Sequence, residues 1–265
     1  MSLEVISIEP EEKRFETPLL FVHGAWHGAW CWEENFLSYF AGQGYAAHAL
    51  SLRGHGNSSG REKLRWARGR DYVADVHEVA GQLPAPPILI AHSMGGYVTQ
   101  KYLEKYQVPA AVLLASVPDN GVLRTTLNIA LHHPLAFLKV NLKLSLYPLV
   151  ETEALAQTLL FSADMPQEQV RRYHEKIQDE SYLGFLDMLL LNLPRPKKVP
   201  PTPMLVLGAA NDAIFTPGEI ARTAKAYGAE SEVFPDMSHD MMLEAGWQGV
   251  AERVAGWLEQ HADRV

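Results

Sequence analysis

The sequence contains a single cysteine, Cys31, among its 265 residues. One cysteine can form neither an internal disulfide nor a cysteine-rich zinc module, so both kinds of framework are excluded. Nowhere do about 18 apolar residues follow one another, so no transmembrane helix is predicted. Acidic residues also interrupt the stretch where a signal peptide would have its apolar core, at Glu4, Glu9, Glu11 and Glu12. We therefore expect a cytoplasmic protein.

Positive charge is scarce as well. The 31 Asp and Glu residues outnumber the 23 Lys and Arg residues, which gives a formal net charge of −8. A net-acidic chain argues against nucleic acid or an anionic membrane surface as the main partner. Hydrophobic residues make up 47% of the chain, which is enough for a buried core. The length suits one large α/β domain or two small ones.

The order of the hydrophobic runs predicts the fold class. Short apolar runs alternate with longer amphipathic stretches, as in the βαβ units of a mostly parallel sheet flanked by helices. The predicted strands are Leu3–Ile8, Pro18–Val22, Tyr45–Leu50, Ile88–Ala91, Ala111–Ala115, Met204–Leu207 and Glu230–Phe234. A marginal eighth strand is predicted at Lys13–Glu16. The helices predicted between them are Glu33–Gln43, Asp71–Leu83, Met94–Tyr106, Pro217–Tyr227 and Trp247–His261.

This alternation stops between Asn120 and Lys198, where the sequence has helical periodicity throughout. The helices predicted there are Gly121–His132, Leu135–Leu146, Glu151–Phe161, Pro166–Gln178 and Ser181–Leu193. Strands resume after the proline-rich run Pro194–Pro203, which favours an insertion over a second independent domain. We therefore predict an α/β core of residues 1–119 and 199–265, with a helical cap of residues 120–198 inserted before the penultimate strand.

A serine stands at the junction of a predicted strand and a predicted helix. The strand Ile88–Ala91 is followed by His-Ser-Met-Gly-Gly at positions 92–96, and a helix comes next. This arrangement resembles the nucleophile elbow of the α/β-hydrolase family, a tight turn that projects a serine hydroxyl above the sheet. Gly95 fits the family pattern G-x-S-x-G, whereas Ala91 departs from it. The resemblance implies an α/β-hydrolase fold of about eight strands with Ser93 as nucleophile; the alternative is that Ser93 is an ordinary helix N-cap.

The loop after the strand Pro18–Val22 supports the same resemblance. It reads His-Gly-Ala-Trp at positions 23–26, and a His-Gly pair is found in the family at this place. The resemblance implies that the backbone N–H groups of Ala25 and Met94 form an oxyanion hole. Trp26 is a candidate wall of the substrate pocket, with core packing as the alternative.

A serine hydroxyl is a poor nucleophile unless a histidine takes its proton and a carboxylate orients that histidine. In the family the acid follows the serine and the histidine comes last. Asp212 follows the penultimate predicted strand and His239 follows the last one, so the resemblance implies a triad of Ser93, Asp212 and His239. Asp119 is the rival acid, because some relatives carry the carboxylate after the earlier strand Ala111–Ala115.

Other histidines are less suited to catalysis. His23 and His27 are four residues apart, but Gly24 and Gly28 break any helix there, so a zinc pair is not expected. The loop at residues 53–58 matches the family pattern R-G-x-G-x-S, and we interpret its His55 as structural. No metal-ligand cluster, glycine-rich phosphate loop or flavin fingerprint is present, so no metal and no cofactor are predicted. The oligomeric state is left open.

The resemblance implies a serine hydrolase, similar to esterases and lysophospholipases. It would cleave a carboxylic ester or related acyl bond of a small, partly apolar substrate through an acyl-enzyme. The many large apolar residues of the cap favour an acyl or aromatic group in that substrate. The alternatives are a C–C bond hydrolase, a thioester hydrolase, a perhydrolase or a lyase on the same scaffold. A ligand-binding receptor of hydrolase fold with little turnover is a further alternative.

Overall fold

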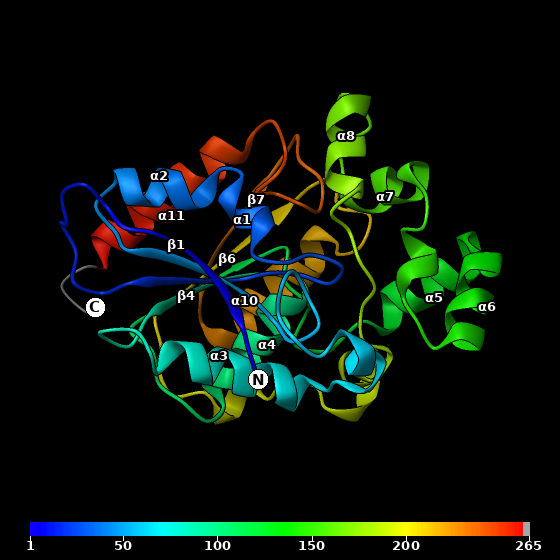
Figure 1. The fold of residues 1–265 in the computed structure, drawn as a ribbon, viewed down its shortest axis with the longest axis horizontal. Helices are drawn as coiled ribbons and strands as arrows, with labels where there is room; N and C mark the ends of the chain where they lie inside the picture. Colours follow the sequence, from blue (N-terminus) through cyan, green and yellow to red (C-terminus); the bar gives the residue numbers. More distant parts are fainter. Residues whose placement is uncertain (262–265) are drawn as a thin grey trace.

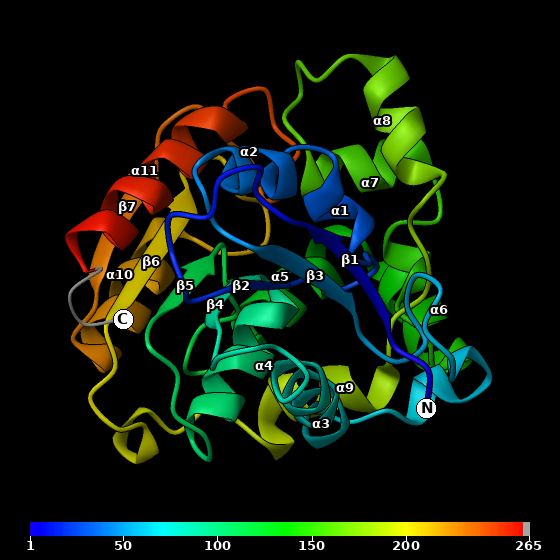
Figure 2. The ribbon, with the colours of Figure 1, turned by 60° about the vertical axis from the view of Figure 1, so that its left-hand side comes forward.

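The structure is a computed structural model that describes residues 1–261. A seven-stranded sheet forms its centre, with helices on both faces (Figures 1 and 2). The strands are β1 (Glu4–Ile8), β2 (Leu19–Val22), β3 (Ala47–Ser51), β4 (Ile88–His92), β5 (Ala111–Leu114), β6 (Met204–Ala209) and β7 (Glu230–Phe234). Across the sheet their order is β1-β3-β2-β4-β5-β6-β7. Strand β1 pairs antiparallel with β3, and every other pair is parallel.

Two groups of helices cover the sheet (Figure 1). One group contains α1 (Trp30–Glu33), α2 (Phe36–Gly42) and α11 (Trp247–Gln260). The other contains α3 (Gly69–Ala80), which follows the 3₁₀ turn η1 (Arg61–Trp66), together with α4 (Met94–Leu103) and α10 (Pro217–Tyr227). Because both faces are covered, every residue of β2 to β6 is buried, which explains the continuous apolar runs in the sequence.

The strand order places two loops side by side at one edge of the sheet. From β2 the chain first adds β3 on one side and then β4 on the other, so the order reverses at β2. The loops after β2 and β4 therefore meet at the carboxyl ends of neighbouring parallel strands. Open α/β sheets bind their ligands in the crevice at such a reversal.

Two predicted elements differ from the structure. The predicted eighth strand at Lys13–Glu16 is wrong: Arg14 N and Phe15 N both donate to Gly44 O, whereas a strand ladder needs successive partners. The predicted helix Glu33–Gln43 is divided into α1 and α2 at Asn35, whose φ of −142° lies outside the helical region. The other core elements are present, with ends shifted by a few residues.

The chain between β5 and β6 is mostly helical, and its helices α5 to α8 gather at one end of the sheet (Figure 1). Its elements are α5 (Leu123–His132), α6 (Pro134–Lys143), η2 (Tyr147–Leu149), α7 (Glu153–Leu160), α8 (Gln167–His174), α9 (Tyr182–Leu186), the π-helical η3 (Asp187–Leu191) and η4 (Pro196–Lys198). We call residues 120–198 the cap segment; the exact division from the core stays a prediction. No helix within residues 1–261 has the length and apolar character needed to cross a bilayer.

A buried carboxylate from the cap segment joins it to the core. Glu180, 1% exposed, accepts a hydrogen bond from the Tyr72 hydroxyl at 2.7 Å, and its Oε2 lies 2.9 Å from His55 Nε2. It also accepts a hydrogen bond from the backbone N–H of Ser181. Removing this carboxylate would leave polar groups of His55 and Tyr72 buried without their partner, which is costly in a dry interior.

We predict that Glu180→Ala lowers the free energy of unfolding by about 3 kcal/mol, because it breaks this buried contact between cap and core. Urea-induced unfolding followed by circular dichroism measures the change. Glu175→Ala, at an exposed position of the same segment, is the control and should change stability by less than about 0.5 kcal/mol. Equal effects of the two substitutions would contradict the role given to Glu180.

Candidate active site

Ser93 is the single residue between β4 and α4, and its backbone has φ +50° and ψ −116°. Positive φ is strained for a residue with a side chain, so the surroundings must hold this turn. A Cβ atom on Gly95 would lie 2.3 Å from Val22 O, and one on Gly96 would lie 2.1 Å from Ser116 Oγ. Helix α4 can therefore begin this close to the ends of β2 and β5 only because both positions are glycine.

Three side chains from three strand ends form one hydrogen-bonded series, which we call the Ser93 series. Ser93 Oγ lies 2.9 Å from His239 Nε2, and His239 Nδ1 lies 2.8 Å from Asp212 Oδ2. The second oxygen of Asp212 accepts hydrogen bonds from the backbone N–H groups of Ile214 and Phe215, at 2.7 and 3.0 Å. These bonds fix the carboxylate, and the carboxylate in turn orients the imidazole. Ser93 is 6% exposed and His239 1% exposed.

The charge of Asp212 changes the proton affinity of His239. Burial by itself lowers the pKa of the imidazole, because it disfavours the charged form. The negative charge of Asp212 and its hydrogen bond act in the opposite direction and raise the pKa above the ordinary value of 6.5. His239 therefore binds a proton more tightly than a solvent-exposed histidine does.

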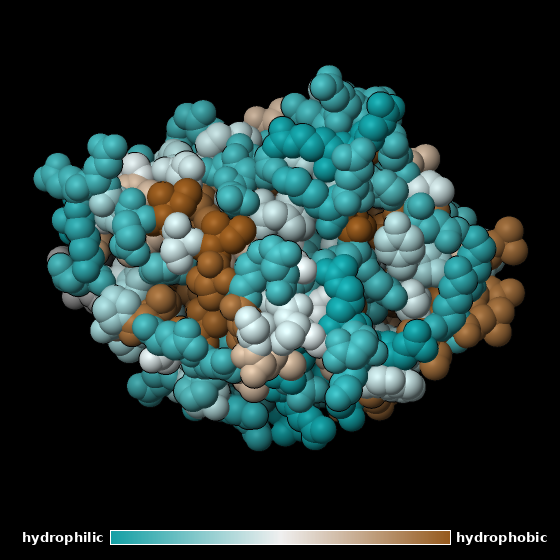
Figure 3. Space-filling model, in the orientation of Figure 1, coloured by the Kyte–Doolittle hydropathy of each residue, from teal (hydrophilic) through white to brown (hydrophobic). Residues whose placement is uncertain are grey.

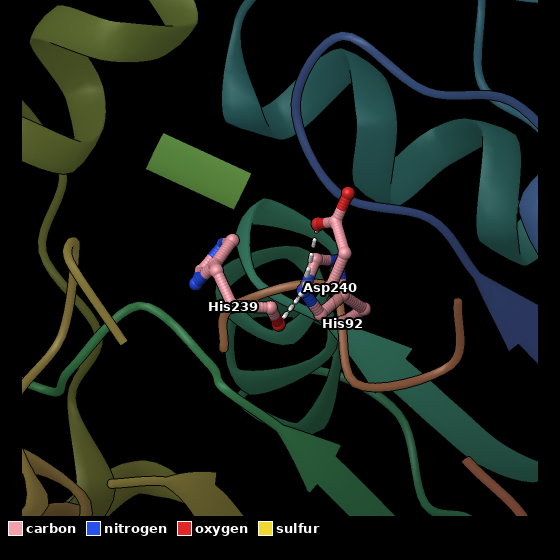
Figure 4. Close-up of side chains that lie close together, drawn as sticks. All are labelled: His92, His239 and Asp240. Carbon is pink, nitrogen blue, oxygen red and sulfur yellow. Dashed lines mark hydrogen bonds and ion pairs between the residues drawn. The ribbon is translucent and has the colours of Figure 1, made fainter. Parts of the chain in front are cut away.

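A second group of buried polar side chains lies behind His239 (Figure 4). His92 Nε2 donates to the backbone carbonyl of His239 at 3.0 Å, and Asp240 Oδ1 lies 3.7 Å from the same nitrogen. Burial and the nearby His239 lower the pKa of His92 to about 3, so this histidine remains neutral. Asp240 Oδ2 lies 3.0 Å from His27 Nε2, an ion-pair contact without the alignment of a hydrogen bond. His27 Nδ1 donates to Ala25 O at 2.6 Å, which ties this group to the loop after β2.

The sequence analysis missed this cluster, because His92 and Asp240 lie far apart in the chain. Their ligand atoms and one of His239 lie within 4.8 Å of one another, a spacing at which a metal ion could be held. However, both ring nitrogens of His239 already face Ser93 or Asp212. In Figure 4 the backbone carbonyl of His239 points towards His92, and the ring centroids of these two histidines are 4.7 Å apart. A metal bound here would therefore disrupt the Ser93 series.

Two backbone amides beside Ser93 are available to a ligand. Ala25 and Met94 line the same cavity as Ser93, and neither N–H donates to a protein group within residues 1–261. Trp26 also lines the cavity, although it is only 7% exposed and has a positive φ of +65°. Its carbonyl accepts the N–H of Gln178 from the cap segment, so it is both a packed residue and a wall of the cavity.

The cavity above Ser93 is apolar. It encloses about 720 Å³ of empty space, including space open to solvent, between the sheet edge and the cap segment. The hydroxyls of Thr125 and Thr126 donate to Ile214 O and Val122 O, so they are already satisfied. The apolar wall contributed by the cap segment includes Ile129, Phe137, Val140, Leu159, Phe185 and Met188. The Ser93 hydroxyl and the two free amides are therefore the main polar groups that a ligand would meet.

The rival candidates lie elsewhere. Asp119 accepts a hydrogen bond from Arg222 Nε at 3.2 Å and has no contact with His239. His23 Nε2 accepts the backbone N–H of Leu52 at 3.0 Å, and burial lowers its pKa well below the ordinary range. His55 contacts the buried carboxylate of the cap segment described above.

Comparison with known families covers most of the chain. A sequence model of the Alpha/beta hydrolase family matches residues 19–253. The chain belongs to this family. An α/β-hydrolase fold is also found in the solved monoacylglycerol lipase of Paleococcus ferrophilus, which superimposes with a TM-score of 0.74 at 20% identity and covers 98% of this chain and 100% of that one.

Curated α/β-hydrolase relatives match only part of this chain. Norfluorocurarine synthase 1 of Strychnos nux-vomica is 32% identical over 108 residues, which are 39% of this chain and 40% of that protein. Methyl jasmonate esterase 1 of Vitis vinifera is 32% identical over 117 residues, which are 40% of this chain and 41% of that protein. The alignments thus span less than half the length of these curated relatives.

We predict that Asp212→Asn lowers the pKa of His239, because the negative charge that raises it is removed. An NMR titration of the His239 ring measures this pKa. Asp119→Asn is the matched control: it removes the same charge beside Arg222 and should leave the His239 pKa unchanged. The opposite pattern would assign the orienting carboxylate to Asp119.

Proposed function

We propose that the chain is a serine hydrolase that cleaves a carboxylic ester, or a related acyl bond, of a small and partly apolar substrate. The continuous series from Ser93 Oγ through His239 to Asp212, at the base of an apolar cavity, carries this proposal. Membership of the α/β-hydrolase family and the likeness to methyl jasmonate esterase 1 of Vitis vinifera support it.

In the proposed reaction Ser93 Oγ attacks the substrate carbonyl while His239 Nε2 takes the serine proton. Asp212 keeps the imidazole in the tautomer that can accept this proton and stabilises the imidazolium that forms. The N–H groups of Ala25 and Met94 donate to the developing oxyanion, and the N-terminus of α4 adds its positive dipole end. His239 then protonates the leaving alcohol, and water, activated by the same histidine, releases the acid from Ser93.

The shape and chemistry of the cavity suggest the substrate class. Its cap wall offers aliphatic and aromatic side chains, and its threonine hydroxyls are satisfied within the protein. A charged or strongly polar acyl group would lose its hydration there without gaining hydrogen bonds. An acyl chain or an aromatic acid would bury its apolar surface and leave the carbonyl near Ser93.

We predict that kcat/KM for p-nitrophenyl esters rises from acetate through butyrate and hexanoate to octanoate. Each methylene group moved from water into the cavity contributes about 0.8 kcal/mol, or roughly fourfold. Release of p-nitrophenol measures the rates. Ser93→Ala should abolish both turnover and labelling by a fluorophosphonate, because both need the serine oxygen.

The Ser93→Ala variant must be folded, as judged by circular dichroism, for this comparison. Turnover retained by the folded variant would exclude the serine mechanism. Labelling of the wild type without turnover of any ester would indicate a ligand-binding receptor instead. Preference for acetate over every longer ester would mean that the cavity takes a small substrate.

We predict that kcat/KM rises with pH through an apparent pKa above 6.5. His239 must be neutral to accept the serine proton, and Asp212 raises the pH at which it loses its own proton. Initial rates with one ester between about pH 5 and pH 9 measure this value. An apparent pKa below 6.5, or a rate independent of pH, would contradict the role of His239 as the base.

A further inference from the structure

The outer surface of the cap segment carries an unusual set of exposed leucines. Helix α5 exposes Leu123, Leu127 and Leu131, each more than half accessible. Helix α6, which packs against α5, exposes its own three: Leu135, Leu138 and Leu142. We call these six residues the leucine face. Figure 3 shows hydrophobic surface gathered at the end of the molecule where α5 and α6 lie in Figure 1.

The spacing of these leucines makes each helix two-sided. In α5 they recur at every fourth residue, and in α6 at intervals of three and four, so each set forms one stripe. The opposite sides of the same helices line the cavity above Ser93, through residues such as Ile129 and Val140. The apolar side chains on one side of each helix thus line the cavity. The leucines on the other side are covered by nothing within residues 1–261.

Charge distinguishes this part of the chain from the rest. Residues 120–150 contain Arg124, Lys139 and Lys143 and no Asp or Glu, although the whole chain carries a net charge of −8. Arg124 and Lys139 pair with carboxylates from outside this stretch, Glu219 and Glu151. Helices α5 and α6 therefore carry no acidic side chain of their own, and Lys143 is their one cation without a carboxylate partner within residues 1–261. Net charge argued against an anionic membrane for the chain as a whole, but the local charge does not.

These features fit a lipid surface better than a second protein. Protein interfaces draw their binding energy mainly from tryptophan, tyrosine and arginine, and leucine is under-represented among such residues. A symmetric pair of copies would also bring together two pairs of helices that carry cations and no acidic residue of their own. Hydrocarbon, in contrast, requires no directional contacts, and lysine or arginine beside an apolar helix face can contact lipid phosphates.

We propose that the leucine face docks on a phospholipid bilayer, with α5 and α6 lying in the plane of its surface. The cavity above Ser93 then lies one helix, about 10 Å, from the lipid, so that an acyl substrate dissolved in the membrane is close to its site. Docking itself does not depend on the proposed function; the delivery of an acyl substrate rests on it.

The test is flotation with vesicles of phosphatidylcholine and phosphatidylglycerol. The Ser93→Ala protein is used so that no lipid is hydrolysed during the measurement. We expect this protein to float with the vesicles, and Leu131→Glu/Leu142→Glu in the same background to bind about tenfold more weakly for each substitution. Leu131 and Leu142 are 78% and 76% exposed, and neither lines the cavity, so the fold should tolerate the change.

Two matched variants serve as controls. Ala221→Glu/Ala226→Glu, made in the same Ser93→Ala parent protein, places the same two charges on exposed positions of α10. This variant should bind vesicles as well as the parent does. Leu131→Met/Leu142→Met keeps the face apolar and should also retain binding. Failure of the parent protein to float, or equal binding by the Leu→Glu and Ala→Glu variants, would overturn the proposal. So would a dimer at micromolar concentration that Leu131→Glu/Leu142→Glu converts to monomer, since the face would then join two copies.

A second assay keeps the two proposals apart. The same substitutions are made in the protein that retains Ser93, and each variant is tested for hydrolysis of a soluble short-chain ester. Leu131→Glu/Leu142→Glu should leave this rate unchanged, because the leucine face lies outside the cavity. Flotation without ester hydrolysis would support docking and contradict the proposed function. Hydrolysis without flotation would do the reverse.

Discussion

The arrangement around Ser93 depends on how closely helix α4 approaches the end of the sheet. The chain must turn from β4 into α4 at one residue, and Ser93 takes up a positive φ to do so. The approach is possible because Gly95 and Gly96 have no Cβ atoms to meet the backbone after β2 and the side chain after β5. The same turn puts the Met94 amide, the first of α4, beside the serine hydroxyl, at the point where the strand order reverses.

Behind this turn lies a polar interior whose members support one another. His92 remains neutral and donates to the carbonyl of His239, which helps to hold the loop that carries the imidazole. Asp240 lies between His92 and His27, and His27 in turn donates to the carbonyl of Ala25. The histidine loop and the loop with the free amide are thereby linked through buried side chains. Partners of this kind restrict the orientation of the groups in front of them.

The cap segment combines three roles in fewer than 80 residues. Its inner side chains close the cavity, Glu180 joins it to two core side chains, and its outer leucines remain uncovered within the described chain. An amphipathic helix normally buries one face and presents polar residues on the other. Helices α5 and α6 instead have apolar residues on both sides, which is why the hydrophobic content of the cap could not be divided between pocket, core and surface before the structure was known.

The sequence by itself determined the strands, most helices and the helical insertion, because apolar periodicity is a local property. The grouping of Ser93, Asp212 and His239 was implied by the resemblance of their loops to the family motifs. Ala91 departs from the family pattern G-x-S-x-G, and the structure buries it in β4. Local patterns could not exclude the short run at Lys13–Glu16, which lacks a second strand to pair with. Only the tertiary structure separated Asp212 from Asp119 as the partner of His239, and brought His27, His92 and Asp240 together. Those relations depend on distances between residues far apart in the chain, which packing alone decides.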